Sequence, residues 1–476
     1  MASGMVPASC LLINSPGIIP FLPVVRLTPL IYNKEYGVSF FRSLYYIRPG
    51  ENAMDSQLHK QFKIIFFGTL HVLALAAMAM ACGIVCGVVG GLFARGVTAV
   101  TGIRFRHPAM MLLLPIGSVL IFLFYHVLRY DKAKGTNMVI LSIRCGEKIP
   151  FRMAPAIFVS SIFSHLCGAS VGREGAALQL GGSIGHAMGH LFHLDHKERR
   201  TMVTCGMAAA FSAVFGTPAT AIFFSMEMVD VGMMNYGSIV PVTFAAFTAR
   251  AAASHWCGVP SESYLISAPP AFSVLTVSKL AFLAICTGFV SILYCLAIQR
   301  FSRYSQSLMK NRYLRALVLG SILFLLTWLT GGHTYNGTGI HIIEAALSGQ
   351  AGDIQWYTFL MKILFTALSL AAGYKGGEIV PALYIGASFG SFFGGLMGLP
   401  SSFCAAIGMG ALFCGVTNSP VASLFICLEM FGIGGLPYYM MAVALSYVSS
   451  GYYGLYSAQQ ILHSKYDSQL IDSDAQ

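Results

Sequence analysis

The chain has 476 residues, of which 56% are hydrophobic and only 10% are charged. Soluble domains carry about a quarter charged residues, so this composition excludes a soluble multi-domain enzyme and indicates a multi-pass membrane protein. The formal net charge of +11 does not indicate nucleic-acid binding, because the basic residues gather in short connections between apolar segments, as cytoplasmic loops do.

The first 53 residues differ in character from the remainder of the chain. They are rich in proline and lack the order of segments that marks a signal peptide. Met54 is a plausible natural start, so we interpret 1–53 as an over-extended start or a disordered extension. We divide the rest into a first transmembrane repeat (54–256), a second (257–462) and a short C-terminal tail (463–476).

Apolar segments follow one another through both repeats. We expect them near 62–100, 108–129, 151–166, 174–192, 201–229, 237–256, 272–299, 314–331, 355–373, 379–398, 402–415, 419–433 and 435–453. Several are too short, or too interrupted by glycine and proline, to cross about 30 Å as straight helices of about 20 residues. Broken or re-entrant helices are tolerated only where they pack in protein or line a wet cavity. The pattern predicts an all-α polytopic transporter or channel.

An internal repeat supports this prediction. The stretch from Gly206 through Pro218 to Glu227 aligns without gaps onto a later stretch that runs from Gly408 through Pro420 to Glu429. A glycine stripe also recurs in the same order, first as Gly181, Gly185 and Gly189 and then as Gly386, Gly390 and Gly394. Matching interrupted segments in two halves are typical of a transporter built from inverted repeats, with its site near the midplane. The equivalence of Glu227 and Glu429 predicts a structural role for both, such as capping a helix.

Three glycine-led motifs precede expected helices: Gly135-Thr136-Asn137, Gly172-Arg173-Glu174-Gly175 and Gly376-Gly377-Glu378-Ile379-Val380. A helix N-terminus presents unpaired N–H groups and about half a positive charge. Several such ends aimed at one point would form an anion site. Each motif taken alone is better explained as an ordinary helix start, whereas all three in order, in a repeated membrane chain, are much more specific.

Glu174 and Glu378 are carboxylates at the edge of apolar segments, where a charge costs several kcal/mol and usually faces a pathway or a partner. The simpler alternatives are ion pairs at helix ends, between Glu174 and Arg173 and between Glu378 and Lys375.

From about Lys60 to Leu462 the chain resembles the CLC family of chloride channels and anion/proton antiporters. The motifs that carry the resemblance are Gly-Arg-Glu-Gly at 172–175, Gly-Gly-x-x-x-Pro at 376–381 and Gly-Leu-Tyr-Ser at 454–457. The resemblance implies a homodimer with one pathway in each subunit. It also implies that Glu174 is the gating, proton-transferring carboxylate and that the Tyr456 hydroxyl donates to the anion.

Three departures resemble the fluoride-specific branch, the fluoride/proton antiporters. Thr136 and Asn137 stand where chloride-handling members carry a serine motif, Glu378 stands where they carry an apolar residue, and Met228 occupies the slot of an inner glutamate. Direct alignment favours Thr136 for the serine position, whereas the preference of the branch favours Asn137, which we prefer. The anion-binding residues implied are Glu378, Asn137, Thr136 and Tyr456, with Gly135, Gly172, Arg173, Gly175, Gly377, Ile379 and Val380 around them.

The resulting expectation is export of cytoplasmic fluoride in exchange for protons, across the plasma membrane of a bacterium. Its partners would be fluoride, protons, membrane lipids and a second subunit, with no cofactor, resident metal or nucleic acid and no enzymatic activity. A chloride/proton exchanger or a passive anion channel of the same fold is one alternative. The other is a divalent-metal transporter built on His186, His190 and His193, which lie on one helix face.

Overall fold

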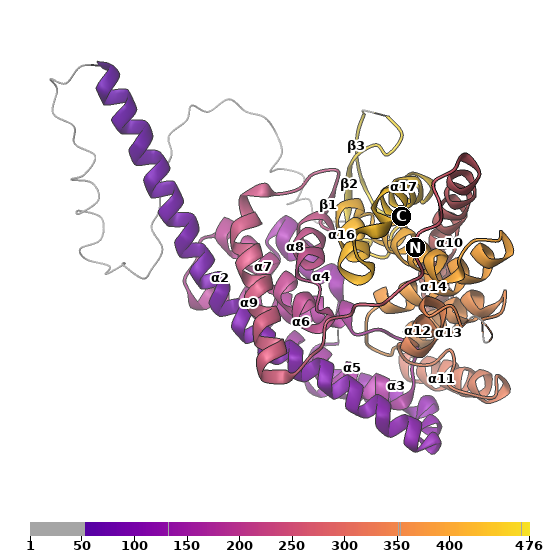
Figure 1. Ribbon diagram of the computed structural model, residues 1–476. Coiled ribbons are helices and arrows are strands. Elements are labelled where there is room, and N and C mark those ends of the chain that lie inside the picture. Colours follow the sequence, from indigo (N-terminus) through magenta and orange to yellow (C-terminus); the bar gives the residue numbers. More distant parts are fainter. Residues whose placement is uncertain (1–52, 132, 351, 353, 468) are drawn as a thin grey trace.

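The structure is a computed structural model that describes residues 53–476 apart from positions 132, 351, 353 and 468 (Figure 1). The interpretation of 1–53 as an extension therefore lies almost wholly outside the described residues. The described chain is mostly helical, and its earlier and later helices form two groups side by side (Figure 1).

The first group contains eight α-helices: α2 (Ala53–Arg106), α3 (Leu114–Val127), α4 (Thr136–Cys145), α5 (Met153–Cys167), α6 (Glu174–Leu191), α7 (His196–Phe215), α8 (Pro218–Glu227) and α9 (Ile239–Cys257). The second contains α10 (Val274–Leu308), α11 (Arg312–Leu329), α12 (Ile340–Leu347), α13 (Thr358–Ala372), α14 (Ile379–Leu396), α15 (Ser401–Thr417), α16 (Pro420–Phe431) and α17 (Leu436–Ser449). Short 3₁₀ turns, η3 (Pro108–Leu113), η4 (Tyr236–Ser238) and η6 (Ile433–Gly435), precede α3, α9 and α17.

Within the described part of the chain, five helical stretches are long and apolar enough to cross a membrane, namely 61–106, 108–127, 274–308, 312–329 and 379–396. Other apolar helices, such as α5, α13, α15 and α16, are shorter. The expected mixture of long and interrupted helices is present.

Two differences from the expected segments have local causes. The segment expected at 201–229 is two helices, because Gly216 ends α7 in a left-handed conformation (φ +79) and Pro218 begins α8. The short helix α12 lies outside every expected segment, since its eight residues are too few to give a periodic signal.

A small three-stranded sheet was not predicted. β1 (Asp230–Val231) pairs in parallel with β2 (Gln460–His463), which pairs antiparallel with β3 (Leu470–Asp474). Three apolar side chains, those of Val231, Ile461 and Ala475, form a small buried cluster of their own. The sheet therefore anchors the end of the chain to the turn after α8.

The glycine stripes bring pairs of helices into close contact. A Cβ atom on Gly181 of α6 would lie 2.0 Å from the Gly206 carbonyl oxygen of α7. A Cβ atom on Gly386 of α14 would lie 2.3 Å from the Gly408 carbonyl oxygen of α15. Larger residues would force these helices apart, so the same packing device is used at equivalent places in the two groups.

Glu227 and Glu429 cap helices across the two groups. Glu227 ends α8 and accepts from the amides of Val421 and Ala422 in α16 at 3.1 and 3.0 Å. Glu429, near the end of α16, accepts from the amides of Ala219 and Thr220 in α8 at 2.9 and 2.8 Å. The expected capping role is therefore present in a reciprocal form, and the stacked rings of Phe223 and Phe425, 4.4 Å apart, lie between the same two helices.

Candidate functional site

The loops that precede α6 and α14 are paired directly. The Gly172 amide donates to the Gly377 carbonyl at 2.7 Å, and the Gly377 amide donates to the Gly172 carbonyl at 2.7 Å. This isolated antiparallel bridge brings two of the three glycine-led motifs to one place. The N-termini of α6 and α14 consequently begin side by side.

Glycine is required at this bridge because backbone packs on backbone. A Cβ atom on Gly377 would lie 2.4 Å from the Gly175 amide nitrogen, and one on Gly175 would lie 2.8 Å from the Gly377 Cα. The same construction places the Glu378 carboxylate near the first turn of α6, since its Oε2 would be 3.7 Å from a Cβ on Gly175.

Glu174 is fully buried, with 0% of its surface exposed. Its Oε1 accepts from Arg173 Nε at 3.2 Å, and its Oε2 accepts from the Arg173 backbone amide at 3.1 Å. The ion pair suggested as the simpler alternative is thus formed, but both partners lie inside the protein. A buried ion pair stabilises little by itself, because desolvating both charges offsets most of their attraction.

Glu378 precedes the first residue of α14. Its backbone carbonyl accepts from the Tyr294 hydroxyl at 2.9 Å. Lys375 does not form an ion pair with the Glu378 carboxylate, since no nitrogen–oxygen contact within 4 Å joins these two described residues. Lys375 Nζ lies instead over the Tyr125 ring, 5.2 Å from the ring centroid. The Glu378 side chain is left facing a cavity.

That cavity has a volume of about 420 Å³ and brings together residues from both groups of helices. Five of the residues expected at the site line it: Gly135, Thr136, Asn137, Glu378 and Tyr456. Lys375, Gln179 and Tyr125 add further polar groups to its wall.

The Tyr456 hydroxyl is buried at this cavity and has no hydrogen-bond partner among the described residues. A buried hydroxyl without a partner costs roughly 1–3 kcal/mol. The carboxylates of Glu378 and Glu174 both lie near enough to act on it electrostatically. The hydroxyl is therefore a donor available to a bound anion.

Asn137 and Thr136 hold different positions in the first turn of α4. Asn137 Nδ2 donates to Ser457 Oγ at 3.3 Å, and Asn137 Oδ1 accepts from the Ala458 amide at 3.2 Å. The Thr136 hydroxyl lies 3.5 Å from the Gly175 carbonyl and accepts from Gln179 Nε2 at 3.3 Å. An amide nitrogen carries two N–H groups, so Asn137 keeps one donor for the cavity, whereas Thr136 has only one.

The other expected residues do not line this cavity in the described structure. This group consists of Gly172, Arg173, Glu174, Gly175, Gly377, Ile379 and Val380. Ile379 and Val380 are buried in the first turn of α14, with 0% and 3% of their surfaces exposed. In the described conformation Glu378 lines the chamber and Glu174 does not.

The residues that precede α4, α6 and α14, namely Gly135, Arg173 and Glu378, make no capping hydrogen bond with their own side chains. At α6 the Glu174 carboxylate accepts from the Arg173 amide. The first turns of these helices place partial positive charge near the site, which favours negative charge there.

The histidines do not assemble into a metal centre. The rings of His186 and His190 lie 4.8 Å apart, but the described residues contain no group of three His, Cys, Asp or Glu side chains arranged to hold a metal ion.

Three contributors were missed in the sequence: Gln179, Tyr294 and Glu262. Glu262 accepts a hydrogen bond from Arg173 Nη2, although it lies in the connection between α9 and α10. Gln179 lies one turn into α6, where the helical period could have indicated it, whereas Tyr294 and Glu262 reach the site only through the tertiary fold.

A family comparison gives this geometry its context. The family described as voltage gated chloride channel matches residues 116–451. The chain belongs to the CLC family of voltage-gated chloride channels. The fold class inferred from the sequence is thereby confirmed, and the chain is a multi-pass membrane protein rather than an enzyme.

Individual CLC relatives differ in how similar they are. The chain is 33% identical over 401 residues to a chloride/fluoride channel protein of Pseudomonas syringae pv. tomato, covering 83% of this chain and 87% of that protein. It is 26% identical over 388 residues to an H(+)/Cl(−) exchange transporter of Yersinia pestis, covering 75% and 80%.

Solved structures give the same ranking. A CLC-type fluoride/proton antiporter matches with a TM-score of 0.79 and 30% identity, over 82% of this chain and 98% of that one. A slow cyanobacterial Cl⁻/H⁺ antiporter matches with a TM-score of 0.67 and 18% identity, over 79% and 94%, which is a likeness of fold alone.

Proposed function

We propose that this CLC protein is a fluoride/proton antiporter that exports cytoplasmic fluoride and is driven by the inward proton gradient. The observation that carries the proposal is the position of Glu378, a carboxylate on the wall of a chamber that also contains the unpartnered Tyr456 hydroxyl. The names of the relatives, a chloride/fluoride channel protein and a fluoride/proton antiporter, support the same substrate.

The chemistry of fluoride accounts for a carboxyl group in an anion chamber. Fluoride is small and strongly hydrated, so a site must replace its water with strong hydrogen-bond donors. A protonated carboxyl group donates a short, strong O–H hydrogen bond to a charged acceptor. In this proposal Glu378 carries a proton when fluoride is bound, and Tyr456, the second N–H of Asn137 and the uncapped end of α4 complete the donors.

Glu174 is the proton carrier in this proposal. In the described conformation its carboxylate accepts from Arg173 and is shielded from water. Protonation would cancel its charge and weaken its interaction with Arg173. The neutral side chain could then turn toward the chamber and exchange its proton there.

We further propose a homodimer with one pathway in each subunit, and a division of the chain into repeats at 54–256 and 257–462. Residues from both halves of the chain line the chamber, as a pathway within each subunit requires. The reciprocal caps of Glu227 and Glu429 support the repeats.

The test is anion flux from liposomes that contain the purified protein. Wild-type protein should release fluoride much faster than chloride, and Glu378→Gln should slow fluoride release at least tenfold, because the amide cannot cycle a proton. Glu344→Gln, an exposed glutamate on α12 away from the chamber, is the matched control and should behave as wild type.

Equal rates for fluoride and chloride would favour the chloride exchanger or the passive channel instead. The divalent-metal alternative predicts flux that a chelator abolishes and that His186→Ala removes. Fluoride flux that survives both treatments would exclude it.

A further inference from the structure

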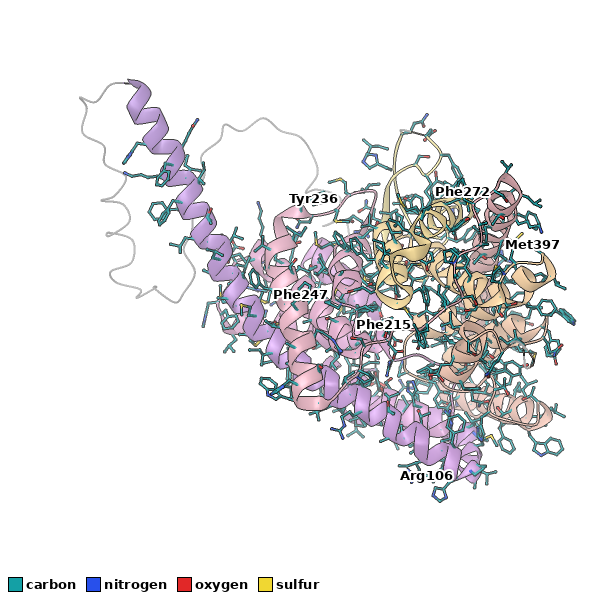
Figure 2. All side chains as sticks on the ribbon, in the orientation of Figure 1. Arg106, Phe215, Tyr236, Phe247, Phe272 and Met397 are labelled. Atoms are coloured by element: carbon teal, nitrogen blue, oxygen red, sulfur yellow. The ribbon has the colours of Figure 1, made fainter. Side chains whose placement is uncertain are left out.

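The connection between α9 and α10 passes the site and contributes a charged group to it. Residues 258–273 form neither helix nor strand, and their path crosses between the two groups of helices (Figure 1). The Glu262 amide donates to the Phe215 carbonyl at 3.4 Å, and the Tyr264 amide donates to the Met430 carbonyl at 2.8 Å. Phe215, labelled in Figure 2, lies where the two groups meet, so the connection is fixed there to both groups.

Glu262 and Glu174 share one guanidinium group. Arg173 donates to Glu174 through Nε at 3.2 Å and to Glu262 through Nη2. The other oxygen of Glu262 accepts from the Tyr264 hydroxyl at 2.6 Å, so the Glu262 carboxylate is held in place. The Glu262 side chain is 18% exposed, whereas the Glu174 side chain is 0% exposed and that of Arg173 is 9% exposed.

This sharing matters because Arg173 is buried. Removing one partner of a buried ion pair leaves an uncompensated charge, which is strongly unfavourable. If Glu174 were the sole partner of Arg173, each departure of Glu174 would leave such a charge behind. With Glu262 in place, Arg173 keeps a carboxylate whichever way Glu174 points.

We propose that Glu262 is a fixed counter-ion of Arg173 that allows Glu174 to be protonated and to leave Arg173 in each transport cycle. This inference rests on the proposed fluoride/proton exchange and adds a positioning residue to it. Glu262 acts through Arg173, and in the described structure it does not line the anion chamber.

The charges around Glu262 are consistent with this role. Arg173 faces it from the loop before α6, and Tyr264 contacts it from within the same connection. Glu344 on α12 acts on Tyr264 electrostatically, and Arg250 on α9 binds the connection at the Val259 carbonyl, 2.9 Å away. Arg173 is thus the cation in direct contact with Glu262 among these described groups.

The experiment measures coupled fluoride/proton exchange in liposomes as a function of pH, with the full chain. In Glu262→Gln the ionised Glu174 is the sole carboxylate that contacts Arg173 among the described residues. Glu174 should therefore become protonated at a lower pH than in the wild-type protein. We expect the pH of half-maximal rate to fall by about one unit and the rate at pH 7 to fall about tenfold. Tyr264→Phe should cause a smaller shift in the same direction, because it loosens Glu262.

Two further variants serve as matched controls. Glu262→Asp keeps the charge and should restore most of the wild-type profile. Glu344→Gln removes a nearby carboxylate that does not contact Arg173, and its profile should equal that of wild type.

The inference is overturned if Glu262→Gln has the same pH of half-maximal rate as the wild-type protein. This holds whether the maximal rate is unchanged or is lowered equally at every pH, which is the result that a purely structural role would give. If Glu262→Gln does not fold, an unshifted profile for Tyr264→Phe overturns it instead. Wild-type protein that does not exchange fluoride for protons would refute the proposed function itself, and the inference with it. Intact wild-type exchange with unshifted variants would refute only the counter-ion role.

Discussion

The Gly172 and Gly377 backbones donate to each other at 2.7 Å in both directions, and this pairing joins the two halves at the point where α6 and α14 begin. Through it, Glu174 and Glu378 belong to one structural unit although they are distant in sequence. A transport cycle that uses both carboxylates depends on this bridge staying intact.

Gly377→Ala should therefore abolish transport and reduce the yield of folded protein. Its Cβ would lie 2.4 Å from the Gly175 amide nitrogen, a backbone atom that cannot move aside without displacing α6. Size-exclusion chromatography and fluoride efflux would measure the two effects. Gly434→Ala, at a glycine with no atom within 4 Å of the added Cβ, is the matched control and should retain both properties. A fully active Gly377→Ala protein would contradict the role given to the bridge.

Tyr456→Phe should lower the transport rate and leave stability unchanged, whereas Tyr294→Phe should lower stability. The Tyr456 hydroxyl has no protein partner in the described structure, so its removal should weaken fluoride transport severalfold without lowering the thermal midpoint. The Tyr294 hydroxyl donates to the Glu378 carbonyl, and its loss should destabilise the protein by about 1 kcal/mol. Thermal unfolding in detergent, paired with efflux rates, separates the two cases. A destabilised Tyr456→Phe protein with normal transport would reverse the assignment.

Glu227→Ala and Glu429→Ala should destabilise the protein without changing the ratio of protons to fluoride. Each removes two backbone hydrogen bonds from a helix N-terminus, and Glu429→Ala also removes one from the Thr220 hydroxyl. Loss of such a cap is worth about 1–2 kcal/mol. The unfolding midpoint and the transport ratio are the quantities to measure. A changed ratio in Glu227→Ala alone would instead indicate that Glu227 carries protons.

Asn137→Ala should lower the preference for fluoride over chloride more than Thr136→Val does. The Asn137→Ala substitution removes the spare N–H donor and also the hydrogen bonds to Ser457 and Ala458, the residues directly after Tyr456. Thr136→Val instead removes a hydroxyl already engaged by Gln179, so its main effect should be on stability. The measurement is fluoride efflux with and without competing chloride. A larger selectivity loss in Thr136→Val would give the selectivity position to Thr136.

Most helix positions and helix–helix contacts could be predicted from the sequence because they depend on local residue patterns. Apolar runs, Pro218 and Pro420, and the repeated glycine stripes predict where most helices begin and pack. The equivalence of Glu227 and Glu429 predicted their shared capping role, although not that each caps the helix of the other half.

Other features depend on contacts between distant residues and carry no local signal. The bridge between Gly172 and Gly377, the placement of Lys375 over Tyr125 and the approach of Glu262 to Arg173 are all of this kind. The small sheet was missed because β1 has only two residues and pairs with β2, a strand more than 200 residues later in the sequence. Glu262 in particular lies in a polar connection, where a carboxylate is common and does not indicate a functional site.

The most direct test of the whole account is simultaneous recording of fluoride and pH outside liposomes loaded with fluoride. Wild-type protein should move protons inward as fluoride leaves, so the external medium becomes alkaline, and a chloride gradient should produce little of either. Glu174→Gln should lose the proton movement whatever fluoride flux remains. Proton uptake that persists in Glu174→Gln, or fluoride release by wild-type protein with no proton movement at all, would contradict the account.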